Sequence, residues 1–141
     1  MLHRVARETE RYDCGIQNQD LPLTDPGSKL LRATAVLAEE VDGGIVVFTN
    51  TGVLPRLLSG LRPAGVPIYA FTDNELVFRE LLLHWGVEPF LTDFVCDAQA
   101  TVAAAFTTLV ENGWANRGDQ MAVIVNVLGD KTVNTIQLRK V

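Results

Sequence analysis

A short polar segment lies between an apolar run and a segment with helical spacing, and its residue types suit it to binding an anion. It follows Ile45–Phe48 and consists of four residues, Thr49, Asn50, Thr51 and Gly52. Free amides at a helix start attract negative charge, and the two threonine hydroxyls can donate further hydrogen bonds, so the turn predicts a phosphate site. Pro55 offers no amide, and the turn matches neither a Walker A loop nor a dinucleotide fingerprint. A plain capped helix start is therefore the alternative.

Other reactive side chains do not form a constellation that could support catalysis. The histidines and cysteines lack metal-ligand spacing, and no Ser-His-Asp or Cys-His order is present. The sequence therefore predicts no catalytic residue and no metal site. A small enzyme that uses Thr49, Asp73 or Lys131 is a weaker alternative, because no partner orients a base or nucleophile.

Composition narrows the possible partners. The chain has 141 residues, a net charge of -5 and 48% apolar residues, which is typical of one soluble globular domain. No basic cluster indicates a nucleic-acid surface, and no apolar run approaches the ~20 residues that cross a bilayer. We therefore expect neither nucleic acid nor membrane as a partner. The first residues lack the core of a signal peptide, so we expect a cytoplasmic protein.

Periodicity and turn residues predict the elements that position the polar turn. Helices are expected at 1–12, 26–41, 53–61, 74–85 and 97–112, and strands at 45–48, 67–71, 87–91, 121–128 and 135–140. Asp25 and Pro26 suit the start of the second helix, and Thr72-x-x-Glu75 has the pattern of a capping box. The last helix is expected to lie against the sheet through its alanines. These are Ala98, Ala100, Ala103, Ala104 and Ala105.

Wholly apolar strands that alternate with helices predict a parallel sheet covered on both faces. The fold class is thus a three-layer α/β/α domain of about five strands, the last one antiparallel because its link at 129–131 is short. Residues 1–25 form a helix and linking loop, and residues 26–141 form the α/β core. Ligands of such folds gather at the carboxyl ends of the parallel strands, where residues 49–52 and 72–74 are expected.

Several segments together resemble the C-terminal domain of pyruvate kinase. They are MLHRVARETE, LTDPGSKLLRATAVLAEEVDGGIVVFTNTG, LRPAGVPIYAFTDNE, HWGVEPFL and NRGDQMAVIVNVLGDKTVNTIQLRKV, in the family's order. The resemblance implies a five-stranded regulatory domain that does not itself perform catalysis. Transfer of phosphate from phosphoenolpyruvate to ADP uses a barrel with Mg²⁺ and K⁺, for which this chain has no room, so we expect no cofactor here. The alternative is a stand-alone phosphometabolite-binding module, which a native gene starting at Met1 would support.

The resemblance also implies an effector site and a subunit contact. A phosphorylated sugar or nucleotide would bind the 49–52 turn together with Lys131 and Thr132. The loop around Lys131 is shorter than in the family, and Asp130 opposes an anion, so we expect binding that is weak, altered or lost. Homo-oligomers are expected through the helix at 26–41, which is apolar on two sides, and the edge strand at 135–140.

Overall fold

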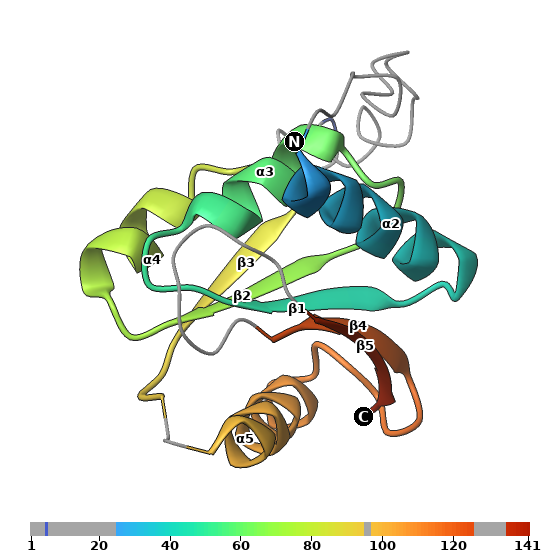
Figure 1. Ribbon diagram of the computed structural model, residues 1–141. Coiled ribbons are helices and arrows are strands. Elements are labelled where there is room, and N and C mark those ends of the chain that lie inside the picture. Colours follow the sequence, from blue (N-terminus) through green and yellow to red (C-terminus); the bar gives the residue numbers. More distant parts are fainter. Residues whose placement is uncertain (1–4, 6–24, 95–96, 126–134) are drawn as a thin grey trace.

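The computed structural model describes residues 5, 25–94, 97–125 and 135–141 (Figure 1). Nearly all of the expected lead segment 1–25 lies outside the described residues, as do Lys131 and Thr132. The described helices are α2 (Pro26–Glu40), α3 (Val53–Leu61), α4 (Glu75–Leu81) and α5 (Ala98–Glu111). The strands are β1 (Gly44–Phe48), β2 (Ile68–Thr72), β3 (Val87–Leu91), β4 (Gln120–Ile124) and β5 (Ile136–Lys140). β4 ends before the expected 128, and residues 126–128 lie outside the described part.

The five strands form one sheet in the order β3-β2-β1-β4-β5. β1 pairs in parallel with β2 and β4, β2 pairs in parallel with β3, and β5 runs antiparallel to β4. Helices α2, α3 and α4 cover one face and α5 lies on the other (Figure 1). The predicted three-layer α/β fold with an antiparallel last strand is confirmed.

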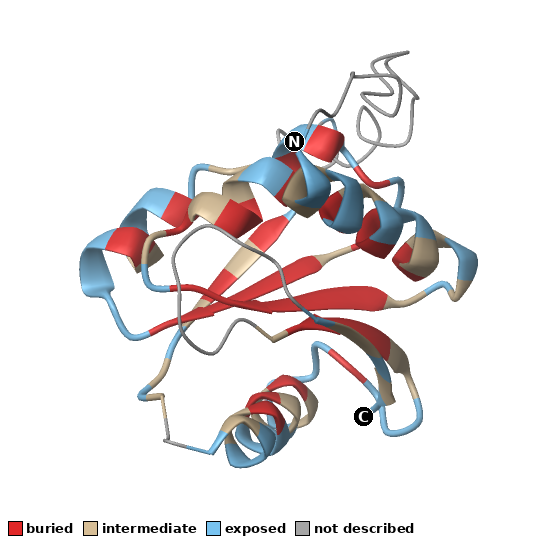
Figure 2. Cartoon of the chain, in the orientation of Figure 1, coloured by how far each residue is buried: buried red, intermediate tan, exposed pale blue. Residues whose placement is uncertain are grey.

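The core has two halves because alternate residues of each strand point to opposite faces. Ile45 and Val47 of β1 pack beneath α2 and α3, whereas Val46 and Phe48 face α5. Strands β1 and β2 are buried along their whole length (Figure 2). Burial on both faces explains why these strands read as unbroken apolar runs rather than as alternating ones.

The start of α2 follows the capping rules. The Asp25 carboxylate accepts hydrogen bonds from the Ser28 amide at 2.8 Å and from the Ser28 hydroxyl at 2.6 Å, and Pro26 occupies the first helical turn. These hydrogen bonds from Ser28 hold the pKa of Asp25 below its ordinary value. The prediction from Asp25 and Pro26 is confirmed.

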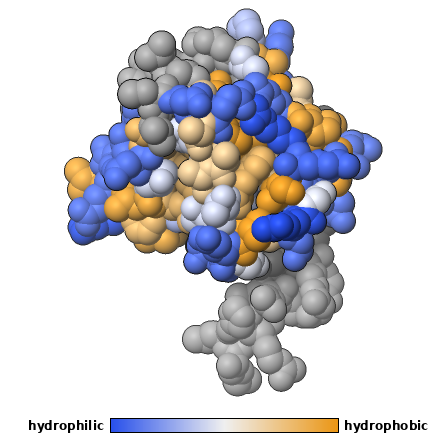
Figure 3. All heavy atoms as spheres, turned by 90° about the horizontal axis from the view of Figure 1, so that it is seen from below, coloured by the Kyte–Doolittle hydropathy of each residue, from blue (hydrophilic) through white to orange (hydrophobic). Residues whose placement is uncertain are grey.

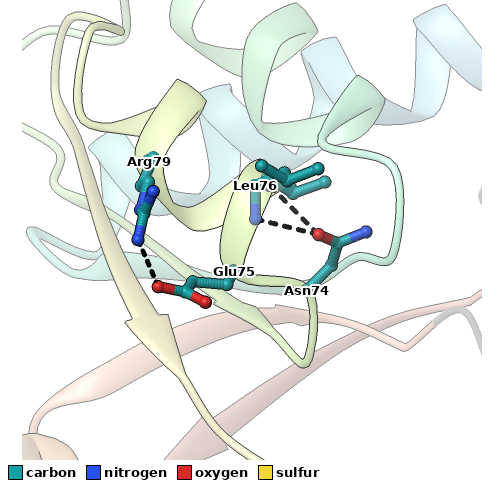
Figure 4. Close-up of polar contacts among 5 residues, drawn as sticks. Asn74, Glu75, Leu76 and Arg79 are labelled. Atoms are coloured by element: carbon teal, nitrogen blue, oxygen red, sulfur yellow. Dashed lines mark hydrogen bonds and ion pairs between the residues drawn. The ribbon is translucent and has the colours of Figure 1, made fainter.

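The start of α4 differs from the predicted capping box. Asn74 is the cap, and its side-chain oxygen accepts from the amides of Leu76 at 2.9 Å and Val77 at 3.4 Å (Figure 4). Glu75 forms an ion pair with Arg79 instead of reaching back. The capping-box prediction was wrong because Thr72 is the buried last residue of β2, two residues too early to cap the helix.

α4 is also shorter than the expected 74–85. Beyond Leu81 the chain tightens, with the Leu83 and His84 amides donating to carbonyls three residues earlier. Gly86 then adopts a positive φ of 68° directly before β3. The chain must reverse here to enter β3, which ends the helix early.

Of the five alanines expected to face the sheet from α5, only Ala105 is buried against it. Val102, Ala105 and Leu109 are buried, whereas Ala100, Ala103 and Ala104 are exposed. Larger apolar side chains remove more area from water, so the helix turns valine and leucine inward. The surface in the middle of this face is accordingly apolar, with hydrophilic residues around it (Figure 3).

Candidate functional site

The turn from Thr49 to Gly52 lies at the carboxyl end of β1, and α3 begins directly after it. The Thr49 amide donates to the Phe71 carbonyl at 2.9 Å, which ties the turn to β2. The first-turn amides of α3 therefore lie along the border of the sheet that is formed by the carboxyl ends of its parallel strands. This is the placement that the sequence predicted for residues 49–52. This border, called the same edge below, is distinct from the edge strands β3 and β5.

Within this turn the threonine hydroxyl already has a structural role. Thr49 is 7% exposed, and its Oγ1 accepts a hydrogen bond from the Gly52 amide at 2.8 Å. Gly52 has a φ of 75°, and a Cβ there would lie 3.1 Å from Val77 Cγ1, so the position favours glycine. Asn50 is exposed and Thr51 half-buried. The remaining donors toward a ligand are thus the Thr49 hydroxyl hydrogen, the Thr51 hydroxyl, the Asn50 amide and the first two amides of α3, since Pro55 has no N–H and the Arg56 amide donates to the Gly52 carbonyl.

The neighbouring turns at the same edge use threonine in the same way. Thr72 ends β2 fully buried, and its Oγ1 accepts from the Asn74 amide at 3.2 Å. Thr92 follows β3, and its amide donates to the Thr72 carbonyl at 2.9 Å. Phe48 is in register with Phe71, so the turns after β1 and β2 lie side by side, as expected for 49–52 and 72–74.

The charges near this edge do not favour an anion. Asp73 follows β2 and Asp93 follows β3, and both are exposed. On the helices that start here, Arg56 forms an ion pair with Glu80 at 2.8 Å. Arg79 likewise pairs with Glu75. Lys131, the expected effector cation, lies outside the described residues.

Sequence reasoning gave Asp93 no role, and it placed residues 72–74 where ligands gather but considered the Asp73 side chain only for catalysis. The signal was their position one or two residues after a buried strand, where parallel strands place side chains at a common edge. Among the described residues, no group of three or more His, Cys, Asp or Glu side chains could hold a metal ion. No helix in the same part of the chain is long and apolar enough to cross a membrane.

Comparison with known proteins identifies the family to which the chain belongs. Residues 28–138 match the model of the pyruvate kinase alpha/beta domain. Plastidial pyruvate kinase 2 of Arabidopsis thaliana is 38% identical over 100 residues, which cover 68% of this chain and 17% of that protein. Pyruvate kinase isozyme G, chloroplastic, of Ricinus communis is 32% identical over 110 residues, which cover 75% of this chain and 26% of that protein.

Solved structures agree on the fold. A pyruvate kinase from Cryptosporidium parvum superposes with a TM-score of 0.84 at 20% identity, covering 97% of this chain and 28% of that one. The chain thus spans roughly a quarter or less of the relatives' length. Names of several relatives specify plastids or chloroplasts, so the cytoplasmic expectation stays a prediction. The chain belongs to the pyruvate kinase family, in which it corresponds to the C-terminal alpha/beta domain.

Proposed function

We propose that this chain is the assembly and regulatory domain of a pyruvate kinase and takes no part in the chemistry of phosphate transfer. The observation that carries the proposal is the outer edge of β5, which ends the described sheet and offers unpaired backbone groups. The occupant is a second copy of the chain, because most soluble oligomers join identical surfaces about a two-fold axis.

The open backbone groups of β5 follow from its pairing with β4. Val141 donates to Asp119 at 3.0 Å and accepts from Gly118 at 2.8 Å, and Thr135 accepts from Val125. Odd-numbered residues therefore face β4. Strand alternation turns the N–H and C=O groups of Ile136, Leu138 and Lys140 toward the open side.

The nearby side of α2 supplies apolar surface. The Glu39 carboxylate accepts a hydrogen bond from the Ala64 amide at 2.7 Å, so the side of α2 that carries Glu39 faces the segment after α3. At 3.6 residues per turn, Leu30 and Leu37 lie about half a turn from Glu39. Leu30 is exposed and Leu37 half-buried, and α2 packs across β4 next to β5. This explains the second apolar stripe on the helix.

These features specify a register for the dimer. An antiparallel pair centred on Leu138 places Leu138 opposite its own copy and Ile136 opposite Lys140 of the second copy. All three residues then exchange their open backbone groups across the axis. The side chains of Ile136 and Leu138 point to the α2 face, since Leu138 is in register with Ala122 of the core beneath α2.

The assembly proposal is tested by sedimentation of Leu138→Lys. Leu138 is 47% exposed, and two lysines directly opposite each other across the axis would repel. The expected result is loss of the dimer with little change in stability. Leu83→Lys is the matched control, because Leu83 is 87% exposed in the turn after α4. The proposal would be overturned if both variants dimerised as strongly as the parent chain does.

For the effector we propose weak anion binding at the 49–52 turn, supported by the nearby carboxylates. Thermal shift with fructose 1,6-bisphosphate, ribose 5-phosphate, glucose 6-phosphate, AMP and ATP should give no saturable response at low concentrations. A ligand at 100 times its Kd would add about 2.7 kcal/mol of stability, which is easily seen. Asp73→Asn with Asp93→Asn should strengthen any response, whereas Asp42→Asn should not, because Asp42 precedes β1 and the 49–52 turn follows the opposite end of that strand. Saturable stabilisation of the parent chain by low fructose 1,6-bisphosphate would contradict weak binding.

A further inference from the structure

The C-terminal end of α5 places an asparagine and a glycine in a tightly bonded cap. Asn112 caps the helix, and Gly113 follows with a φ of 72°. The Trp114 amide donates to the Leu109 carbonyl at 2.8 Å, and the Gly113 amide donates to the Val110 carbonyl at 3.1 Å. This pair of hydrogen bonds is the pattern of a Schellman motif.

Asn112 is the only one of the seven asparagines that a glycine follows directly. A glycine has no Cβ to hinder its backbone nitrogen, which can reach the side-chain carbonyl carbon of the preceding asparagine. We propose that Asn112 is a site of spontaneous deamidation and that the cap of α5 sets its rate.

The reaction needs only water. The Gly113 nitrogen loses its proton and attacks Cγ of Asn112, the bond from Cγ to Nδ2 breaks, and ammonia leaves with that proton. The resulting five-membered imide takes up one water molecule. Opening at one carbonyl gives aspartate, and opening at the other gives isoaspartate. No oxidant, reductant or metal takes part.

In the folded chain both reacting groups are restrained. Asn112 Nδ2 donates to the Thr108 carbonyl at 2.8 Å, and the attacking Gly113 nitrogen is committed to Val110. Asn112 and Gly113 are both exposed, so water has access and the last turn can open locally. The reaction therefore proceeds from the opened cap, and its rate follows how often that cap opens.

Conversion would weaken the attachment of α5. A new carboxylate would stand beside Glu111 at a helix C-terminus that has no basic residue in its last turn, which the helix dipole disfavours. Isoaspartate would also lengthen the backbone between Leu109 and Trp114. The Trp114 carbonyl accepts the Tyr69 hydroxyl at 2.9 Å, so this link from α5 to β2 would be strained.

Peptide mapping by mass spectrometry after incubation at mildly alkaline pH tests the proposal. Asn112 should convert to aspartate and isoaspartate on the order of tenfold more slowly in the folded chain than in the chain unfolded in urea, because capping bonds must open first. Asn112→Gln should remove the signal, since the longer side chain cannot close the same ring.

Arg117→Gly provides the matched control in one molecule. It creates a second asparagine–glycine pair at Asn116, which is exposed and outside any helix. Asn116 of this variant should convert faster than Asn112 while the chain is folded, and at a similar rate once it is unfolded. Absence of conversion at Asn112 in urea would show that it is not a reactive site. Equal rates in the folded and unfolded chain would show that the cap does not set the rate.

Discussion

The two edges of the sheet are strands of five residues each, but they differ in the backbone groups that they leave open. On β3, the Gly86 carbonyl accepts from Ile68 and the Thr92 amide donates to Thr72, so even-numbered residues face β2. The outward positions are Val87, Pro89 and Leu91. Val87 donates to the His84 carbonyl at 3.3 Å, and Pro89 has no N–H. β3 thus offers one outward donor, whereas β5 offers three.

This difference shows how one sheet can be both protected and available for pairing. A proline on an edge strand removes a donor without cost to the ladder when its nitrogen points outward. Pro89 meets that condition, so a single residue limits pairing at β3. No proline interrupts β5, and the nearby apolar side of α2 favours a partner there.

The largest expected effect is loss of pairing at β5 in Leu138→Pro. The proline removes an outward donor at the centre of the proposed dimer and leaves the bonds to β4 in place. Each copy loses one hydrogen bond across the axis, at about 1 kcal/mol apiece, so we expect the dimer Kd to rise by roughly thirtyfold. Sedimentation at several concentrations measures this change.

Gln137→Pro is the control for that prediction. Gln137 faces β4, so its proline variant should lower the stability of the monomer as well as association. If both variants lowered monomer stability equally, the assignment of outward and inward residues on β5 would be wrong.

The next largest effect is stronger pairing of β3 with a second copy in the variant Pro89→Val. The valine restores an outward N–H on a strand that is otherwise intact, and valine favours strands. We expect β3 pairing to strengthen by on the order of tenfold, or about 1.4 kcal/mol. Light scattering of the double variant Pro89→Val, Leu138→Lys measures association through β3 alone, because Leu138→Lys prevents pairing at β5. Unchanged scattering would mean that Pro89 is not what limits pairing at β3.

Much of the fold was predictable from the sequence, since apolar runs and helical spacing between turn residues placed all five strands and four of the helices. Asp25-Pro26 and Gly113 mark the helix ends correctly because caps act locally. The capping box at Thr72 was wrong, as was the inward placement of Ala100, Ala103 and Ala104 of α5, and the two errors have a common reason. Both depend on which residue the tertiary fold buries, and local spacing does not contain that information.

The site was predictable only in position. That residues 49–52 and 72–74 share an edge follows from parallel strand order. That the Thr49 hydroxyl binds the Gly52 amide, and that Asp73 and Asp93 stand nearby, depends on turn geometry and on which strands are neighbours. Sequence reasoning therefore located the turn without determining how much of its donor capacity is already used.

On the β3 side of the sheet, the segment that follows α5 is attached to β2 by a hydrogen bond from the Tyr69 hydroxyl, a group that can lose its proton. Burial raises the pKa of Tyr69 above its ordinary value of 10.0, with smaller contributions from the charges of Asp119 and Glu88. A raised pKa means that the stabilisation is complete below about pH 10 and is lost as pH rises through the folded-state value.

Tyr69→Phe should remove this alkaline dependence. At neutral pH it should cost about 1 kcal/mol, because the hydrogen bond to the Trp114 carbonyl is lost. Urea denaturation across a pH series from neutral to alkaline measures both effects. The same alkaline loss in parent and variant would assign it to another group.

On the β5 side, α5 is attached through an exposed link, for which we expect the smallest effect. Arg139 donates from Nη2 to Gln99 Oε1 at 2.6 Å and from Nε to Gln137 Oε1 at 2.8 Å. Gln99→Met keeps the side-chain length and removes the acceptor, so it should cost about 0.5 kcal/mol, as exposed polar pairs do. Thr107→Ala, whose hydroxyl bonds only within α5, is the control in urea denaturation. A loss of 2 kcal/mol or more would mean that α5 depends more strongly on β5 than on β2, and pairing of β5 with a second copy would then act on α5 directly.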